Sequence, residues 1–288
     1  MAETLPLVVS IQSQVAYGHV GNGAAALTMR ACGVEVVEVP TTLLSNHPRY
    51  PTTRGRLLEP DLVAELLAGL VERGVHERAA LVLSGFLGRS AVADAVAGFV
   101  ATARAAHPAV IYACDPVMGD ADIGFFAEPA LRRAFAERLV PVADVVLPNA
   151  FELGALTGMP VLGPEDVALA QAALGRPSVV ATSVPVAGAP ERIATVVATD
   201  ESVSAFEVAR LQVRPAGTGD LLAGLVAARL AQGVPLGSAV ARAVAGVRAA
   251  LERTGEGPWA EMPLAASLPV IVAAGAARDG QAGTAASR

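Results

Sequence analysis

The stretch LVVSIQSQVAYGHVGNGAAALTMRACGVEVVEVP, residues 7–40, decides the fold. Residues 7–11, LVVSI, are apolar except for Ser10 and do not alternate with polar residues, which predicts a strand buried on both faces. Residues 23–32 are typical of a helix that stops at Gly33, and residues 34–39 predict a second strand that ends at Pro40. A strand, a helix and a second strand in this order indicate a parallel sheet.

The same alternation continues along the chain, and it predicts a parallel sheet covered by helices on both faces. The expected strands are residues 80–83, 110–114, 145–147 and 178–182, and the expected helices are residues 57–73, 90–106, 128–140 and 150–156. The pattern changes at residues 193–198 and 202–208, where two β-branched runs are joined by three polar residues. This predicts a late β-hairpin.

Two long helices are expected after the hairpin, at residues 220–232 and 236–254. Residues 264–277 are apolar and interrupted by Pro269, and they fit either a helix or a strand. We expect residues 1–276 to form a single α/β domain and the small, polar residues 277–288 to be disordered.

The composition excludes several classes of protein. With 53% apolar and 17% charged residues, the chain can bury a large core, which argues against disorder. The net charge is −6 and no Lys/Arg cluster exceeds a pair, so nothing indicates a nucleic-acid partner. No uncharged apolar run reaches the ~20 residues that a membrane helix needs. Cys32 and Cys114 are expected to be reduced and buried in a cytoplasmic enzyme.

The sequence PAGTGDLLAG, residues 215–224, carries the strongest functional signal. Gly217 and Gly219 leave the backbone bare before a helix, whose unpaired N–H groups and dipole can bind an anion. Asp220 lies in the first turn and can face the bound phosphate. Phosphoryl transfer needs both features, because N–H groups stabilise the transferring group and a carboxylate accepts the proton of the attacking hydroxyl. The alternative is a Gly-rich turn with Asp220 as a capping residue.

Two other segments place carboxylates where strands are expected to end. In CDPVMGD, residues 114–120, Asp115 closes a strand and Asp120 follows in a loop, an arrangement that suits Mg²⁺ but also an ordinary solvated turn. In LPNAFE, residues 147–152, Asn149 and Glu152 have nearly the spacing of a helix capping box. In the functional interpretation, Glu152 points toward a metal-bound water. The two roles are compatible, because a helix N-terminus that faces the site serves either.

The loop IQSQVAYGHVGNG, residues 11–23, should expose Ser13 at the end of the first strand. Its glycines do not follow GxGxxG, so no dinucleotide-binding fold is indicated. The chain also lacks GxxxxGK[ST], which argues against a P-loop kinase.

Together, residues 11–22, SNHPRY (45–50), 114–120, 148–152 and GTGD (217–220) resemble the pyridoxal kinases of the ribokinase-like superfamily. The resemblance spans about residues 5–260. It implies a three-layer α/β/α sandwich with a mostly parallel central sheet. It also implies that ATP phosphorylates the 5′-hydroxyl of pyridoxal, pyridoxine or pyridoxamine. Mg²⁺, a monovalent cation such as K⁺, and a homodimer are further implications of the resemblance.

The resemblance also implies roles for single residues. Asp220 matches the base that deprotonates the 5′-hydroxyl, and the anion hole matches Gly217, Thr218 and Gly219. Ser13 matches the residue that hydrogen-bonds the pyridine ring, and the substrate side also includes His47, Pro48 and Phe86. The metal positions are Asp115, Asp120 and Glu152. The positions facing ATP are Asp115, Leu147, Asn149, Glu152, Thr182, Ser183, Thr218 and, flanking the adenine, Ala205, Phe206, Glu207, Val208 and Leu211.

Three positions depart from the family pattern, all on the substrate side. Pro48 stands where the family usually has Thr, which removes a hydroxyl and an N–H. Phe86 replaces the Tyr of the family's SGY, and Thr53 replaces an aromatic residue before Arg54 and Gly55. Because a site built from hydroxyl groups rejects analogues strongly, such losses can shift specificity.

Two alternatives remain open from the sequence. A hydroxymethylpyrimidine kinase would share GTGD and its base but should lack SNHxxY, which this chain has. A degenerate member would bind a B6 vitamer or a nucleotide without turnover. The substrate-side departures favour this last interpretation, and the intact Asp220 opposes it.

Overall fold

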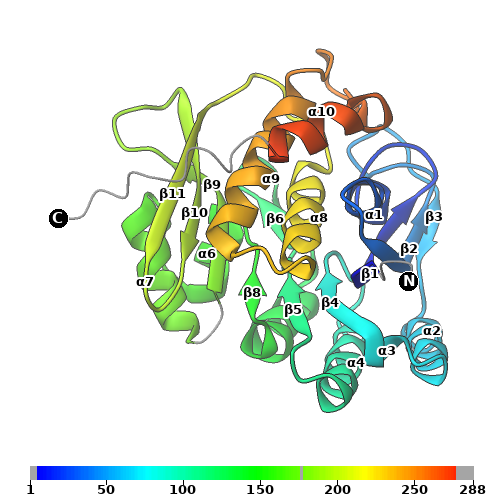
Figure 1. Ribbon diagram of the computed structural model, residues 1–288. Coiled ribbons are helices and arrows are strands. Elements are labelled where there is room, and N and C mark those ends of the chain that lie inside the picture. Colours follow the sequence, from blue (N-terminus) through cyan, green and yellow to red (C-terminus); the bar gives the residue numbers. More distant parts are fainter. Residues whose placement is uncertain (1–4, 176–177, 277–288) are drawn as a thin grey trace.

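The computed structural model describes residues 5–175 and 178–276 (Figure 1). Within these residues, nine strands form one sheet in the order β11-β10-β9-β8-β5-β4-β1-β2-β3. Its strands are β1 (Leu7–Val15), β2 (Glu35–Leu44), β3 (Gly55–Leu57), β4 (Ala79–Ser84), β5 (Ile111–Cys114), β8 (Val145–Val146), β9 (Ser178–Pro185), β10 (Arg192–Ala198) and β11 (Val203–Ala209). A separate two-stranded sheet joins β6 (Gly119–Asp120) to β7 (Gly124–Phe125).

The pairings from β2 through to β9 are parallel, whereas β3, β10 and β11 are antiparallel to their neighbours. The mostly parallel sheet and the late hairpin, β10–β11, are therefore confirmed. β11 is two antiparallel steps from β9, so it runs in the same direction as the parallel strands. The carboxyl ends of β1, β4, β5, β8, β9 and β11 consequently lie at one edge of the sheet.

Helices cover both faces of the sheet (Figure 1). One face carries α1 (Asn22–Ala31), α8 (Thr218–Ala231), α9 (Leu236–Leu251) and α10 (Leu264–Ala276). The other carries α2 (Pro60–Glu72), α3 (Val75–Arg78), α4 (Val92–Ala106), α5 (Pro129–Ala134), α6 (Ala150–Thr157) and α7 (Pro164–Leu174). Successive side chains in a strand point to opposite faces of the sheet: Val8 packs in the core on one face and Val9 in the core on the other. Burial on both faces explains the continuous apolar runs, and the three-layer α/β/α prediction is confirmed.

Several element boundaries differ from the sequence prediction. Pro40 does not end β2, which continues to Leu44. β3 pairs with β2 only from Thr42 onward, so at Pro40 the strand has a strand neighbour on one side only, a position that tolerates Pro. The single helix expected at residues 128–140 is wrong, because α5 gives way to a π-helical turn η1 (Phe135–Leu139) and a 3₁₀ turn η2 (Val140–Val142). Pro141 within η2 cannot continue an α-helix.

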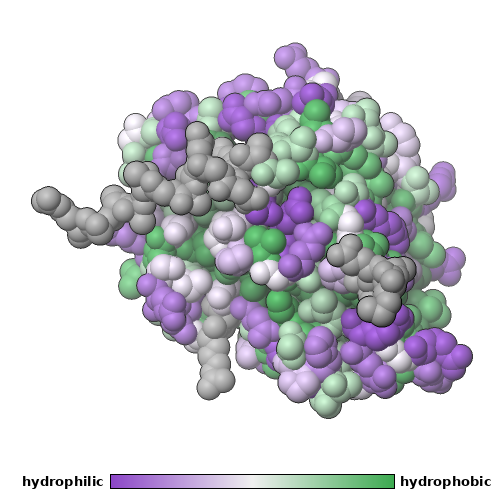
Figure 2. Space-filling model, viewed as in Figure 1, coloured by the Kyte–Doolittle hydropathy of each residue, from purple (hydrophilic) through white to green (hydrophobic). Residues whose placement is uncertain are grey.

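The prediction also missed α7, β3 and the β6–β7 ribbon, and it began the helix that is α2 too early. Residues 264–276, left open as a helix or a strand, are helical despite Pro269. The expected tail at 277–288 lies outside the described residues. The face in Figure 2 mixes polar and apolar side chains, and no helix in the described ranges is long and apolar enough to cross a membrane.

Candidate active site

The loop before α8 turns sharply at Gly217, which caps the helix with a φ of 83°. A Cβ atom here would collide with the carbonyl oxygen of His19. Gly219 lies within the first turn, and a Cβ there would meet nothing within 4 Å. Thr218 donates from Oγ1 to the carbonyl of Pro215 over 3.1 Å. Both glycines therefore leave the backbone bare, as expected: Gly217 takes a left-handed conformation, and Gly219 leaves open space beside the helix N-terminus.

Asp220 is the third residue of α8, so its predicted place in the first turn is confirmed. Its carboxylate accepts a hydrogen bond from the backbone N–H of Gly21. Burial raises the pKa of Asp220, and the Gly21 N–H opposes this rise by stabilising the anion. A raised pKa moves this carboxyl group toward the range in which a base both accepts and releases a proton near neutral pH.

The loop between β1 and α1 forms the wall opposite α8. The carbonyl of His19 packs against Gly217, and the N–H of Gly21 reaches Asp220. Gly21 has a φ of 54°, and a Cβ on it would collide with the carbonyl and the hydroxyl of Ser13. Contacts through this loop thus connect the half-buried Ser13 with Asp220, the candidate base, and with the turn at Gly217, the candidate anion-binding turn.

Two buried carboxylates lie at the carboxyl ends of neighbouring strands. Asp115 follows β5 directly and is buried, as is Glu152 near the start of α6. The pKa of Asp115 is raised well above its ordinary value, first by burial and then by the charges of Glu152 and Asp220. The structure therefore brings together three acidic residues that the sequence singled out at separate motifs.

Glu152 has a structural role that its geometry shows directly. Its Oε1 accepts N–H groups from Met118 at 2.7 Å and Gly119 at 3.2 Å, and its Oε2 accepts the N–H of Asn149 at 2.9 Å. Asn149 Oδ1 accepts the Glu152 N–H at 2.9 Å, so the predicted capping box is complete. Burial raises the pKa of Glu152 to about 7 although the three N–H groups lower it. Oε1 thus holds the residue 118–119 loop against α6, and Oε2 caps the helix.

Asp120 faces the anion-binding loop from the β6–β7 ribbon. Its Oδ1 lies 3.7 Å from Arg214, which also contacts Asp122 at 3.0 Å. In residues 5–175 and 178–276, no three His, Cys, Asp or Glu side chains are grouped to hold a metal. A cation at this edge would therefore depend on one or two carboxylates together with phosphate and water oxygens, as Mg²⁺ commonly does in nucleotide sites.

The residues predicted along the phosphates lie at the same edge. Leu147 is buried directly after β8, and Asn149 forms an isolated parallel bridge with Thr182. Ser183 has a φ of 57° and is the one non-glycine residue with a positive φ in the part of the chain that the structure describes. Backbone strain of this kind clusters at ligand-binding positions.

The predicted adenine-flanking residues lie on β11 and just after it. Phe206 and Val208 pack on the core, whereas Ala205 and Glu207 are exposed. Glu207 pairs with Arg192 across the hairpin at 3.0 Å. Leu211 follows the strand at the carboxyl edge, so the adenine assignment stays a prediction that the topology permits.

On the substrate side, His47 is buried, Pro48 is exposed and Phe86 is half-buried. The carbonyl of Phe86 accepts a hydrogen bond from Thr41 at 2.6 Å, and its ring packs edge-on against Phe126.

Sequence reasoning assigned no role to Gly21, His19 or Glu261, all of which contact the site loops. Gly21 and His19 belong to the 11–22 motif. The glycines of this motif indicate that two backbone segments approach closely, so the sequence could have pointed to these residues. Glu261 belongs to no motif or periodic pattern, so no signal pointed to it.

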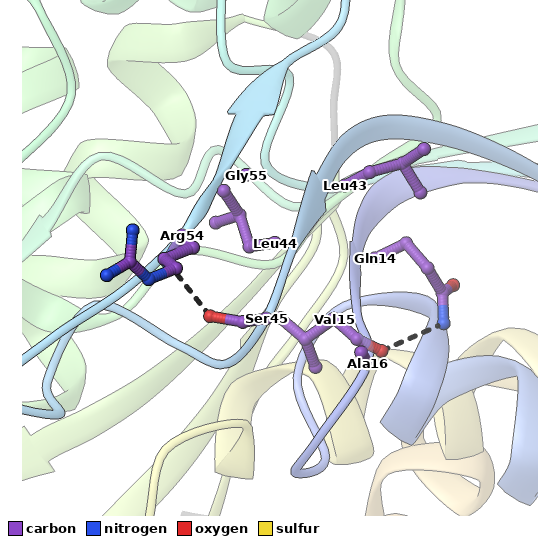
Figure 3. A pocket seen from close by; sticks show the side chains of 8 residues that line it. All are labelled: Gln14, Val15, Ala16, Leu43, Leu44, Ser45, Arg54 and Gly55. Carbon is purple, nitrogen blue, oxygen red and sulfur yellow. Dashed lines mark hydrogen bonds between the residues drawn. The ribbon is translucent and has the colours of Figure 1, made fainter.

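A hollow of about 530 Å³ lies between the ends of β1, β2 and β3, and Figure 3 shows the side chains that line it. It is lined by Gln14, Val15, Ala16, Leu43, Leu44, Ser45, Arg54 and Gly55. Arg54 is its one charged lining residue, and no carboxylate is present to act as a base. The chemistry is therefore better placed at Asp220 than in this hollow.

The comparisons with known proteins identify the family of this chain. The model of the phosphomethylpyrimidine kinase family matches residues 21–260. Pyridoxal kinase PdxY of Leifsonia xyli is 39% identical over 264 residues, covering 90% of this chain and 93% of the relative. Pyridoxal kinase PdxY of Rubrobacter xylanophilus is 40% identical, covering 92% and 93%. This chain belongs to the phosphomethylpyrimidine kinase family, and within it to the pyridoxal kinases.

A solved structure carries the same fold with ligands. Pyridoxal kinase from Leishmania donovani in complex with ADP and pyridoxamine superposes with a TM-score of 0.83 at 28% identity, covering 92% of this chain and 95% of that one. The ribokinase-like fold implied by the sequence motifs is thus confirmed, and so is the kinase assignment.

The acidic group predicts how the stability of this kinase depends on pH. Asp115, Glu152 and Asp220 all have raised pKa values in the folded state. Between about pH 4, the ordinary value for carboxyl groups, and pH 7, the folded state thus binds more protons than the unfolded state. The free energy of unfolding should fall as pH rises, by up to about 1.4 kcal/mol per pH unit for each extra proton.

Urea unfolding from pH 5 to pH 8, without Mg²⁺ or ATP, measures this dependence. Asp115→Asn should flatten it, because the variant removes one buried acid and one charge acting on Glu152. Asp94→Asn, which removes an exposed carboxylate paired with Arg138, is the matched control and should leave the slope unchanged. A wild-type stability that rises over this range would contradict the prediction.

Proposed function

We propose that this chain transfers the γ-phosphoryl group of ATP to the 5′-hydroxyl of pyridoxal, pyridoxine or pyridoxamine, in salvage of vitamin B6. One observation carries the proposal: the Asp220 carboxylate lies in the first turn of α8, beside the bare turn at Gly217 and connected to Ser13 through Gly21. The relatives named pyridoxal kinase support the choice of substrate class.

Each part of this arrangement has a task in the proposed reaction. The N–H groups at the start of α8 and the helix dipole stabilise the transferring phosphoryl group. Asp220 accepts the proton of the 5′-hydroxyl as the oxygen attacks phosphorus. Ser13 orients the pyridine ring. Leu147, Asn149, Thr182, Ser183 and residues 205–211 are proposed to contact ATP.

A divalent cation fits the acidic edge, and we propose Mg²⁺. Asp115 is buried with a raised pKa and faces two other carboxylates, so a cation would relieve their mutual repulsion. Glu152 would act on the cation through water, since its oxygens already accept three N–H groups. When bound, Mg²⁺ supplies charge neutralisation for the phosphates. K⁺ as a second cation rests on the family resemblance.

We also propose a homodimer acting in the cytoplasm. The support is the family resemblance, together with the edge strand β3 and the exposed Leu43 beside it. Light scattering of the purified protein at several concentrations measures the assembly state, and a monomer at all of them would remove the dimer proposal.

An ATP-consumption assay with pyridoxal, pyridoxine, pyridoxamine and hydroxymethylpyrimidine, with and without Mg²⁺, tests the function. We expect Mg²⁺-dependent turnover with at least one B6 vitamer and a lower kcat/KM with hydroxymethylpyrimidine. The reverse preference would favour the hydroxymethylpyrimidine kinase alternative. Vitamer binding without any ATP consumption would instead identify a non-catalytic binding protein.

A further inference from the structure

Glu261 lies in the connection between α9 and α10, far in sequence from the motifs, yet its carboxylate contacts two loops of the site. Its Oε2 accepts the backbone N–H of His19 at 3.2 Å. Its Oε1 accepts the Tyr50 hydroxyl at 3.0 Å and lies 3.2 Å from Nε2 of His47. The carboxylate also lies against the bare backbone of Gly18, where a Cβ would come within 2.6 Å of Oε1.

The first of these loops, residues 16–21, contacts both the turn at Gly217 and the proposed base, Asp220. The residue that donates its N–H to Glu261, His19, is the one whose carbonyl packs on Gly217. Two residues later, Gly21 donates to Asp220. Displacing His19 would therefore move the contacts of both the anion-binding turn and the base.

The second loop is the SNHPRY segment, residues 45–50, on the substrate side. His47 and Tyr50 have ring centroids 4.5 Å apart, and Tyr50 also stacks on Trp259. The Tyr50 hydroxyl donates to Glu261 at 3.0 Å, and its oxygen also lies 3.3 Å from the carbonyl oxygen of Trp259. This loop is thus fastened to the same connection that carries Glu261.

The carboxylate is mostly buried, with 17% of its side chain exposed. Among the residues that the structure describes, its ion-pairing partners are the two histidines and not Arg or Lys. These partners set Glu261 apart from an ordinary surface ion pair between a carboxylate and an Arg or Lys side chain. The carboxylate instead uses both oxygens to join the 16–21 loop, the 45–50 loop and the α9–α10 connection.

We propose that Glu261 is a positioning residue for phosphoryl transfer, holding the 16–21 and 45–50 loops together so that the substrate side of the site is formed before substrates bind. The inference rests on the proposed function, because it gives these loops their catalytic meaning. Glu261 touches neither the base nor the anion-binding turn directly, and it acts through His19, His47 and Tyr50.

The test compares Glu261→Ala and Glu261→Gln with the wild type in steady-state kinetics. Misplacing a substrate-positioning element can cost about 10²-fold, so we expect Glu261→Ala to lower kcat/KM for pyridoxal by about 10- to 100-fold. The KM for ATP should change by less than about 3-fold, because the turn at Gly217 stabilises the phosphoryl group mainly in the transition state and the residues proposed to bind the rest of ATP lie outside both loops. Gln can still accept from His19 and donate to Tyr50, so Glu261→Gln should recover most of the loss.

Glu38→Ala is the matched control, because Glu38 is another partly buried glutamate in an ion pair, with Arg30 at 2.6 Å, away from the site. It should leave both KM values unchanged. Hydrogen exchange without ligands gives a second measurement: peptides covering residues 16–21 and 45–50 should exchange about 10-fold faster in Glu261→Ala and at the wild-type rate in Glu38→Ala.

Equal exchange of these peptides in wild type and Glu261→Ala would overturn the inference. So would a KM for ATP that rises as much as that for pyridoxal, since this would indicate general damage. If the wild type shows no turnover with any B6 vitamer, the proposed function fails, and the exchange measurement still decides whether Glu261 holds the two loops.

Discussion

Asp220→Asn is expected to lower kcat by about 10²- to 10⁴-fold, the range that general-base catalysis typically supplies, while ATP still binds. Asn keeps the size of the side chain and its place in the first turn of α8. It cannot accept the proton of the attacking hydroxyl. Because the variant also removes a half-buried carboxyl group with a raised pKa, the fold should not lose stability near neutral pH. Initial rates with pyridoxal and calorimetric titration with ATP measure the two effects separately.

The control for this variant is Asp61→Asn, which makes the same change in the first turn of α2, on an exposed residue. It should leave kcat unaffected. If Asp220→Asn kept near-normal kcat, Asp220 would not be the base. If it instead lost ATP binding together with activity, the residue would serve nucleotide binding rather than proton transfer.

The layers of the fold could be predicted from the sequence because burial on both faces leaves continuous apolar runs in the strands. The boundaries were harder to predict, since they depend on neighbours that are distant in the chain. Pro40 is tolerated inside β2 because β3 pairs only further along the strand. The helix expected at residues 128–140 ends instead in a π-helical turn and a 3₁₀ turn before and around Pro141. Pro141 adjoins the expected helix in the sequence, so this break was predictable from the sequence.

The candidate site divides in the same way. The turn at Gly217 and the capping box of Asn149 and Glu152 are formed by residues close in sequence, so their spacing indicated them. The mutual influence of Asp115 and Asp220 depends on a sheet edge that joins residues more than a hundred positions apart. Glu261 lies still further from the loops that it contacts, and no local pattern records such a contact.

Gly217→Ala is expected to be the most damaging single substitution in the anion-binding turn. Gly217 has a φ of 83°, and a Cβ would collide with the carbonyl of His19. To relieve this contact, the turn must move away from the 16–21 loop, and the N–H groups at the start of α8 then no longer point where the phosphoryl charge develops. Losing one such donor typically costs 10²- to 10³-fold in kcat. The strained backbone should also lower the free energy of unfolding by about 1–3 kcal/mol.

Gly233→Ala separates the collision from the backbone strain. Gly233 follows the other end of α8 with a φ of 78°, and a Cβ there meets nothing within 4 Å. It should therefore lose a similar amount of stability and keep its kcat. Urea unfolding and initial rates, measured on both variants under conditions where each remains folded, distinguish the two effects. Equal kcat values for the two variants would show that the contact between Gly217 and His19 does not set the geometry of the anion-binding turn.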